Sequence, residues 1–202
     1  MNHAQAEKIY QKFYDVTLPH DAIGGTATIN LLIKLCQTLK PRNVLELGGG
    51  KGTLTYTILK HSDAHVDSYE PLEQFASQMK ENLKEFDGRY TILPSYMLLP
   101  PKRDYDLILI DGGKNDNESG FPKAIVSYLI SLNTVKTVIV EGQRKSQKYW
   151  ITETLWPFFT YKPTKFTDEA GEKKGVLQID CTPSRNILKN FLNHLYYRKK
   201  IY

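Results

Sequence analysis

The sequence predicts a single α/β domain in which a mostly parallel sheet is covered by helices on both faces, giving a three-layer sandwich. Short apolar segments typical of strands alternate with longer segments of helical periodicity, which favours a parallel sheet. Segments 158–166 and 175–181 flank the polar turn 168–174 and predict a terminal antiparallel hairpin. The 202 residues suffice for one domain, and no repeat or linker divides them.

Helices are expected wherever apolar residues recur every three or four positions. Residues 2–14 give the first helix. In the second, residues 26–39, the side chains of Ile29, Ile33 and Cys36 lie on one side. Pro71 suits the start of a later helix, because its missing N–H would be unpaired in a first turn anyway. The other predicted helices span residues 52–60, 71–86, 121–132 and 145–156.

A last helix is expected near the C-terminus, where apolar residues again follow helical spacing. Its apolar positions are Ile187, Leu188, Phe191, Leu192 and Leu195. We expect this apolar side to dock on the domain and to leave the cations of residues 198–200 in solvent.

The predicted strands are short apolar runs over residues 43–48, 65–70, 90–94, 105–111 and 137–141, followed by the hairpin. The first strand ends in glycines at positions 48, 49, 50 and 52, directly before a helix. Glycine accepts positive φ and lets a ligand approach the backbone, and a helix start directs free N–H groups toward it. The arrangement predicts a small-molecule site at the carboxyl edge of the sheet.

Three ligand classes use such loops. A phosphate-binding P-loop requires lysine followed by Ser or Thr, whereas Lys51 is followed by Gly52. A dinucleotide fingerprint requires glycine where Thr53 stands, and this β-branched side chain would obstruct close helix–strand packing. The remaining pattern, an acid followed by alternate glycines, is matched by Glu46 and the glycines at 48, 50 and 52.

This last pattern resembles motif I of the class I S-adenosylmethionine-dependent methyltransferases. Segments His65–Pro71, Asp106–Gly112 and Val138–Glu141 resemble the second, fourth and fifth strands of that family, in the same order. The resemblance covers roughly residues 24–181 and is closest to small O-methyltransferase-like proteins. It implies a Rossmann-like sheet of seven strands in the order 3-2-1-4-5-7-6, with the seventh antiparallel.

The resemblance also implies that the chain binds S-adenosylmethionine. Glu70 would accept hydrogen bonds from the ribose hydroxyls, and Glu46 would help to place the methionine end. Many relatives carry Gly-Asp-Ala after the third strand, where this chain has Pro94, Ser95 and Tyr96; Ser95 can accept one hydrogen bond, and Tyr96 can stack on the adenine. The candidate cofactor-binding residues are Glu46, Gly48, Gly49, Gly50, Gly52, Glu70, Pro71, Ser95, Tyr96 and Asp111.

Candidate catalytic groups follow the fourth and fifth strands. Asp111 and Glu141 end these strands, and Lys114 would act as a base if burial or nearby cations lowered its pKa. His20 is a weaker candidate. Metal-dependent relatives carry an Asp-Asn pair after the fifth strand, whereas Gln143 is the only amide here, so we expect no divalent metal.

Arg144 and Lys145 precede or begin a predicted helix, where cations meet the positive end of the helix dipole. One explanation for this unfavourable placement is that they bind a carboxylate or phosphate of the substrate. The alternative is pairing with Glu141 or simple solvation.

The charge distribution limits the partners. The net charge is +5, and residues 185–202 alone contribute five cations and no acid, so the rest of the chain is neutral. A broad nucleic-acid-binding face is therefore not expected, although the basic tail could contact RNA, acidic lipid or an acidic partner. No signal peptide or membrane span is expected, and the two cysteines show no metal spacing, which together favour a cytoplasmic protein without membrane contact. A homodimer is allowed.

These observations predict a methyltransferase that moves the cofactor methyl group to an oxygen or nitrogen of a small molecule, an anionic molecule being one option. Two alternatives remain. One is a methyltransferase-like protein that binds the cofactor without catalysis, and the other is an RNA methyltransferase.

Overall fold

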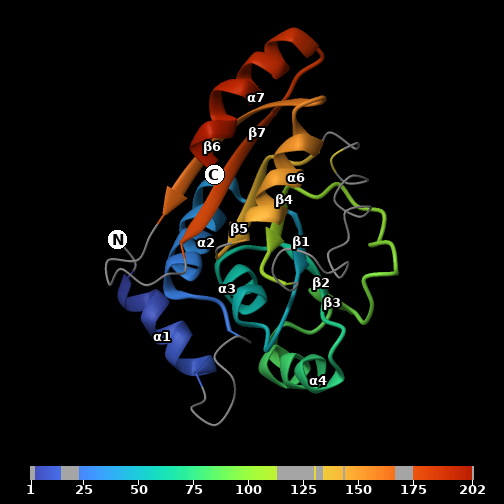
Figure 1. Cartoon of the computed structure of the whole chain (residues 1–202). Coiled ribbons are helices and arrows are strands. Elements are labelled where there is room, and N and C mark those ends of the chain that lie inside the picture. The colour runs from blue at the N-terminus through green and yellow to red at the C-terminus, as the bar shows by residue number, and fades with distance from the viewer. Residues whose placement is uncertain are drawn as a thin grey trace.

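A computed structural model of the whole chain describes residues 3–14, 23–112, 130, 134–142, 144–166 and 175–201. Its centre is a sheet of seven strands in the order β3-β2-β1-β4-β5-β7-β6 (Figure 1). All neighbouring pairs are parallel except those of β7, which runs antiparallel to β5 and β6. The fold class and the strand order implied by the resemblance are thereby confirmed. The strands are β1 (Asn43–Leu47), β2 (His65–Tyr69), β3 (Tyr90–Leu93), β4 (Leu107–Ile110), β5 (Thr137–Glu141), β6 (Phe159–Phe166) and β7 (Val176–Pro183).

Helices cover both faces of the sheet and complete three layers. The helices on one face are α1 (His3–Phe13), α2 (Thr26–Leu39), α3 (Thr53–His61) and α4 (Glu73–Asn82), which is followed by a 3₁₀ turn (Lys84–Phe86). The other face carries α6 (Lys145–Leu155) and α7 (Ile187–Ile201). The predicted helix 121–132 lies outside the described residues except for Ile130, which is buried. None of the described helices is long and apolar enough to cross a bilayer.

Strand β4 explains why the core has two halves. Leu107 and Leu109 pack with the helices of one face, whereas Ile108 and Ile110 pack with those of the other. All four side chains are fully buried. A parallel strand covered on both faces has no polar side, which accounts for the uninterrupted apolar run in the sequence.

The helix predicted over residues 71–86 is shorter in the structure. It begins at Glu73, because Leu72 is extended and its N–H donates to Glu70 Oε1 over 2.9 Å. Pro71 is exposed and precedes the helix, so its predicted place in the first turn is wrong. The side chain of Glu70 thus satisfies a backbone donor that has no acceptor within the helix, because the first N–H groups of a helix lack intrahelical partners.

Helix α7 is turned opposite to the expectation. Its buried residues are Asn190, His194 and Ile201, whereas the five apolar residues predicted to dock are all exposed. The Asn190 side chain donates to the Ser184 carbonyl over 3.0 Å, and His194 Nδ1 lies 2.9 Å from the Tyr161 hydroxyl. Polar residues therefore fix this helix on the sheet.

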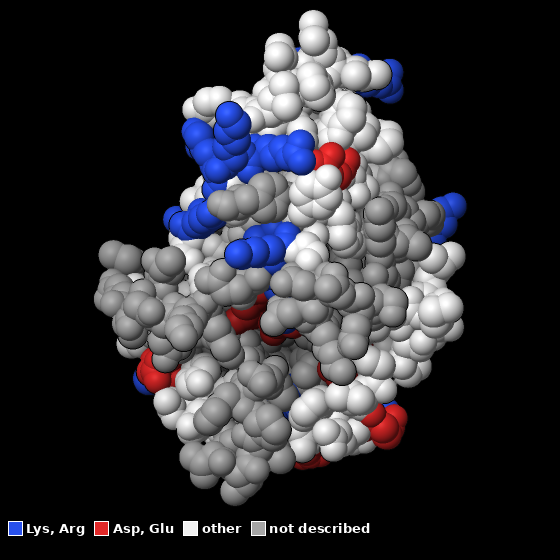
Figure 2. Space-filling model, viewed as in Figure 1, with Lys and Arg blue, Asp and Glu red and all other residues white. Residues whose placement is uncertain are grey.

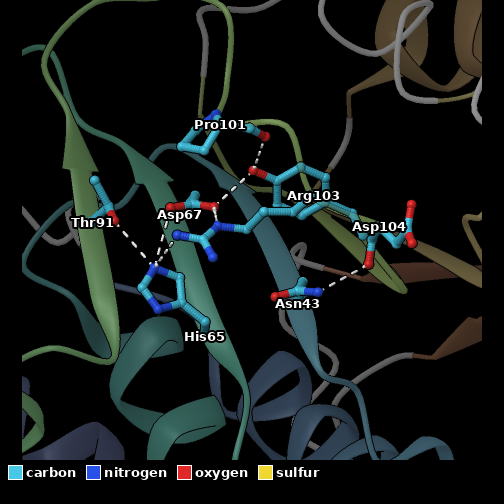
Figure 3. A network of polar contacts seen from close by, with 8 residues as sticks. Asn43, His65, Asp67, Thr91, Pro101, Arg103 and Asp104 are labelled. Atoms are coloured by element: carbon cyan, nitrogen blue, oxygen red, sulfur yellow. Dashed lines mark hydrogen bonds and ion pairs between the residues drawn. The ribbon is translucent and has the colours of Figure 1, made fainter.

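A buried polar network joins β2 to the segment before β4 (Figure 3). Asp67 is fully buried, and its Oδ2 accepts from Arg103 Nε over 2.9 Å and from the Tyr105 hydroxyl over 2.7 Å. His65 Nε2 lies 3.3 Å from the other carboxylate oxygen and 3.1 Å from Thr91 Oγ1. The network ties the middle of the sheet to the chain that carries residues 94–106.

Candidate functional site

The loop after β1 has the backbone that the glycine pattern predicts. Gly48, Gly50 and Gly52 have φ values of 97°, 51° and 87°, a region that side chains rarely adopt. Gly48 and Gly49 both donate their N–H groups to the Tyr69 carbonyl, at 3.0 and 2.9 Å. These bonds hold the loop against the end of β2.

Gly48 also brings the ends of β1 and β4 into contact. A Cβ atom on Gly48 would lie 2.3 Å from the backbone of Gly112, and one on Gly112 would lie 2.6 Å from Gly48. Asp111 donates its N–H to the Leu47 carbonyl over 2.9 Å. The loop that was predicted to bind the cofactor is therefore built directly against Asp111 and Gly112.

Glu70 connects the loop after β1 to the end of β2. Its Oε2 accepts the Gly50 N–H over 2.7 Å, and its Oε1 accepts that of Leu72. Burial raises the pKa of Glu70 above its ordinary value, and the two backbone donors partly oppose this effect. Each oxygen keeps a further lone pair with which to accept from a ligand hydroxyl.

Glu46 lies on strand β1 and its side chain is fully buried. Thr55 and Ser68 both donate hydroxyl protons to its Oε2, and the bond from Ser68 measures 2.5 Å. Its Oε1 has no hydrogen-bond partner among the described residues. Burial raises the pKa of Glu46 to about 7, although both hydroxyls lower it, and the nearby carboxylates Glu70 and Glu141 raise it further.

Asp111 and Glu141 share a hydrogen bond at the ends of β4 and β5. Partial burial of Asp111, with 21% of its side chain exposed, raises its pKa well above the ordinary value, and Glu141 raises it further. Arg144 lies 3.6 Å from Asp111 and opposes the shift. Glu141 Oε1 also accepts the Gly25 N–H over 2.7 Å, which joins the segment before α2 to this site.

The four carboxylates form one electrostatic cluster, because Glu46 responds to Glu70 and Glu141, and Asp111 responds to Glu141 and Glu46. Clustered acids with raised pKa values are costly in an empty site and become favourable when a cation enters. The arrangement thus suits a ligand that carries positive charge and hydroxyl groups. Among the described residues, no group of three or more His, Cys, Asp or Glu side chains is arranged to hold a metal ion.

Tyr96 lies beside this cluster. Its ring stacks on that of Tyr69, with centroids 5.4 Å apart, and burial raises the pKa of its hydroxyl. The Tyr69 hydroxyl donates to the Leu98 carbonyl over 2.7 Å and thereby anchors the segment after β3. Ser95 Oγ accepts the Met97 N–H over 3.1 Å, so it already has one local partner. Tyr69 supports the site, and sequence reasoning missed it because it looks like an ordinary strand residue.

The guanidinium of Arg144 forms hydrogen bonds mainly with backbone carbonyls of the protein itself. It donates to the carbonyls of Glu141, Gly112 and Asp111, the first two over 2.9 and 3.0 Å. Gln147 donates to the same Gly112 carbonyl over 3.2 Å, and its Oε1 has no partner among the described residues. Lys145 is exposed at the start of α6. Gln147 was missed in the sequence, where one amide in a helix carries no signal.

Three candidates fall outside the described residues. These are His20, Lys114 and Gln143.

Lys148, one turn after Arg144, donates to the Gly142 carbonyl over 2.7 Å. Burial lowers the pKa of Lys148, and the cations Lys165 and Arg144 lower it further.

The architecture is similar to that of solved methyltransferases. An O-methyltransferase from Streptomyces achromogenes, involved in tomaymycin synthesis and solved with S-adenosylmethionine, matches with a TM-score of 0.60 at 16% identity, over 89% of each chain. An O-methyltransferase from Bacillus cereus with S-adenosylhomocysteine matches with 0.59 at 18% identity, over 88% of this chain and 90% of that one. A 23S rRNA methyltransferase matches with a TM-score of 0.54 at 17% identity, over 85% of this chain and 75% of that one. No protein-family model and no curated protein matches the sequence. The chain therefore has the fold of the class I S-adenosylmethionine-dependent methyltransferases.

Proposed function

We propose that this chain is an S-adenosylmethionine-dependent methyltransferase that modifies an oxygen or nitrogen of a small molecule. The observation that carries the proposal is the acidic cluster beside the glycine loop. Glu46 is fully buried and has an oxygen without a partner among the described residues. The ammonium and sulfonium groups of the cofactor would offset the repulsion among these carboxylates.

Each part of the site then has a role toward the cofactor. Glu70 would accept from the ribose hydroxyls while the Gly50 N–H holds its orientation. Glu46 would accept from the amino group, and Tyr96 would cover the adenine from its position on Tyr69. The loop glycines would let these groups approach the backbone closely.

When bound, S-adenosylmethionine would supply an electrophilic methyl group on a sulfonium leaving group. The chain must hold the acceptor atom in line and take its proton where it has one. Asp111 and Glu141 share a hydrogen bond at this edge and are the described groups best placed to hold that proton. Lys114 stays a candidate for the same task.

A small acceptor is favoured over RNA by the distribution of charge. Outside residues 185–202 the chain has no net charge, whereas an RNA-binding face needs many cations around the site. At the site itself, Arg144 is committed to backbone carbonyls, whereas Lys145 is an exposed cation at the start of α6 that could bind an anionic acceptor. An RNA methyltransferase is the alternative, since one structural neighbour acts on 23S rRNA.

The first test is calorimetric titration with S-adenosylmethionine and S-adenosylhomocysteine. Wild-type protein should bind at micromolar concentration, and Glu70→Ala should weaken binding by about tenfold or more, since a charged acceptor is lost. Glu73→Ala removes an exposed acid three residues away and should leave affinity unchanged. Absence of binding by folded wild-type protein would overturn the proposal.

Transfer is tested separately with small hydroxy and amino compounds that carry a carboxylate or phosphate, and with ribosomal RNA. Methylation of a small compound supports the proposal. Methylation of RNA alone would replace it with the RNA alternative. Cofactor binding without transfer to any acceptor would instead favour a protein that binds the cofactor without catalysis.

A further inference from the structure

Helix α7 presents an apolar stripe to solvent. Leu188, Leu192 and Leu195 recur at helical spacing and are 68%, 57% and 44% exposed. Ile187 and Phe191 extend the stripe toward the start of the helix, close to which the exposed residue Phe158 accepts the Ser184 N–H through its backbone carbonyl. Separate exposed apolar residues are normal on a protein surface, but a continuous stripe along one helix indicates an interaction site.

The outward direction of the stripe is fixed by the contacts on the opposite side of the helix. Asn190 donates to the carbonyls of Ser184 and Pro157, and Asn193 Oδ1 accepts the Tyr161 N–H over 2.8 Å. His194 is buried against Tyr161. Turning the apolar stripe inward would leave these polar groups without partners, which is costly for buried groups.

Cations lie along and beside the stripe. Arg185, Lys189, Arg198, Lys199 and Lys200 are all exposed, and residues 185–202 contain no acid. Lys199 continues the line of Leu188, Leu192 and Leu195, while Lys189 and Lys200 share the flank that Tyr196 occupies. Among the described residues, Arg198 pairs with Glu153 at 3.8 Å, whereas the other four form no ion pair. Figure 2 shows Lys and Arg gathered over the upper left of this face, where α7 and β6 lie in Figure 1, with little acid among them.

We propose that α7 docks on the surface of a lipid bilayer that contains anionic headgroups. The leucines, Ile187 and Phe191 would enter the boundary between headgroups and acyl chains, while the lysines and arginines would contact the headgroups. The proposal departs from the expectation of no membrane contact, which rested on the absence of a predicted signal peptide or membrane span. It does not depend on the proposed function.

Charge favours an anionic bilayer over a second copy of the chain and over RNA as the partner of α7. A second copy paired through α7 would bring two sets of cations together, with no acid in residues 185–202 to compensate them. RNA would use the cations and could stack on Tyr196, but the leucine and isoleucine side chains of the stripe offer no ring on which a base can stack. An anionic bilayer satisfies both the aliphatic stripe and the cations.

The test is flotation of the full chain with vesicles of phosphatidylcholine, alone or mixed with phosphatidylserine. Wild-type protein should float with the mixed vesicles. The double variant Leu188→Gln, Leu192→Gln should lower partitioning by about tenfold or more. Lys189→Ser should lower it by roughly fivefold, as should Lys199→Ser, and added salt should reduce the effect of both. All four side chains are exposed, so the fold should be retained.

The matched control is Met97→Gln, Leu99→Gln, which removes two exposed apolar side chains beyond β3, at the edge of the sheet opposite β6. It should float as wild type does. Equal loss of flotation in both double variants, or no flotation of wild-type protein, would overturn the proposal. So would a concentration-dependent dimer that the Leu188, Leu192 variant dissociates, or RNA binding that depends on the lysines without vesicle binding.

Discussion

The carboxyl group of Glu46 illustrates what a ligand site costs a protein in the absence of its ligand. The unfolded group titrates near 4.5, and burial raises its pKa to about 7 in the folded chain. The folded state therefore holds this proton more tightly than the unfolded state. The stabilisation is fully present below pH 4.5 and is lost as the pH rises through 7, by an amount of roughly 3 kcal/mol.

Glu46→Gln should remove the loss of stability that follows ionisation of Glu46 at high pH. The amide oxygen can still accept from Thr55 and Ser68, but the side chain cannot ionise. We expect the variant to unfold at higher denaturant concentration than wild type at about pH 8 and to differ little at about pH 4. Its affinity for S-adenosylmethionine should fall. Glu73→Gln, at an exposed site, is the control; parallel pH profiles of wild type and Glu46→Gln would contradict the assignment.

At the scale of elements, the sequence predicts position better than orientation. Helix α2 and strand β5 have the predicted bounds, because continuous periodicity or an uninterrupted apolar run fixes them. Helix α7 also exists as predicted, but spacing shows only which residues share a side. The side that docks is decided by Asn190 and His194, whose partners on β6 and the nearby turns come from elsewhere in the chain.

In the candidate site, too, the sequence predicts features that a local pattern encodes and misses those that depend on long-range contacts. The glycine loop and Glu70 were recognisable because a local pattern encodes the backbone they need. Arg144 was predicted to bind an anionic substrate because its charge lies in an unfavourable place. Its contacts explain that place, since it donates to carbonyls at the ends of both β4 and β5, which are distant in sequence. Tyr69 and Gln147 act through similar long-range contacts and left no local signal.

Arg144→Ala should therefore disturb the ends of two strands. Three charged hydrogen bonds to carbonyls are lost, and Asp111 loses the cation that lies 3.6 Å away, so the affinity for S-adenosylhomocysteine should fall by roughly tenfold or more. Lys145→Ala is the matched control and should leave this affinity unchanged while raising KM for an anionic acceptor. The positioning role is wrong if Arg144→Ala changes only KM for the acceptor and not cofactor affinity.

For the whole molecule, the network around Asp67 joins strand β2 to the segment that leads into β4. Asp67 is fully buried on β2, and Tyr105 and Arg103 precede β4, with β1 lying between them. Arg103 is 36% exposed and can regain water when its partner is removed, which limits the cost of losing this ion pair. Tyr105 is buried, although its hydroxyl also lies 3.0 Å from the Pro101 carbonyl.

Asp67→Ala should accordingly lower the free energy of unfolding by roughly 3 kcal/mol, from a cavity and a lost network of charged hydrogen bonds. Chemical denaturation monitored by circular dichroism measures this change, and Asp87→Ala, at an exposed position, should stay within about 0.5 kcal/mol of wild type. Because Asp67 is not among the groups that shift the pKa of Glu46, Glu70 or Asp111, cofactor affinity of the folded variant should be unchanged. A loss of affinity at full stability would mean that Asp67 acts on the site through the segment that carries Tyr96, rather than on the fold as a whole.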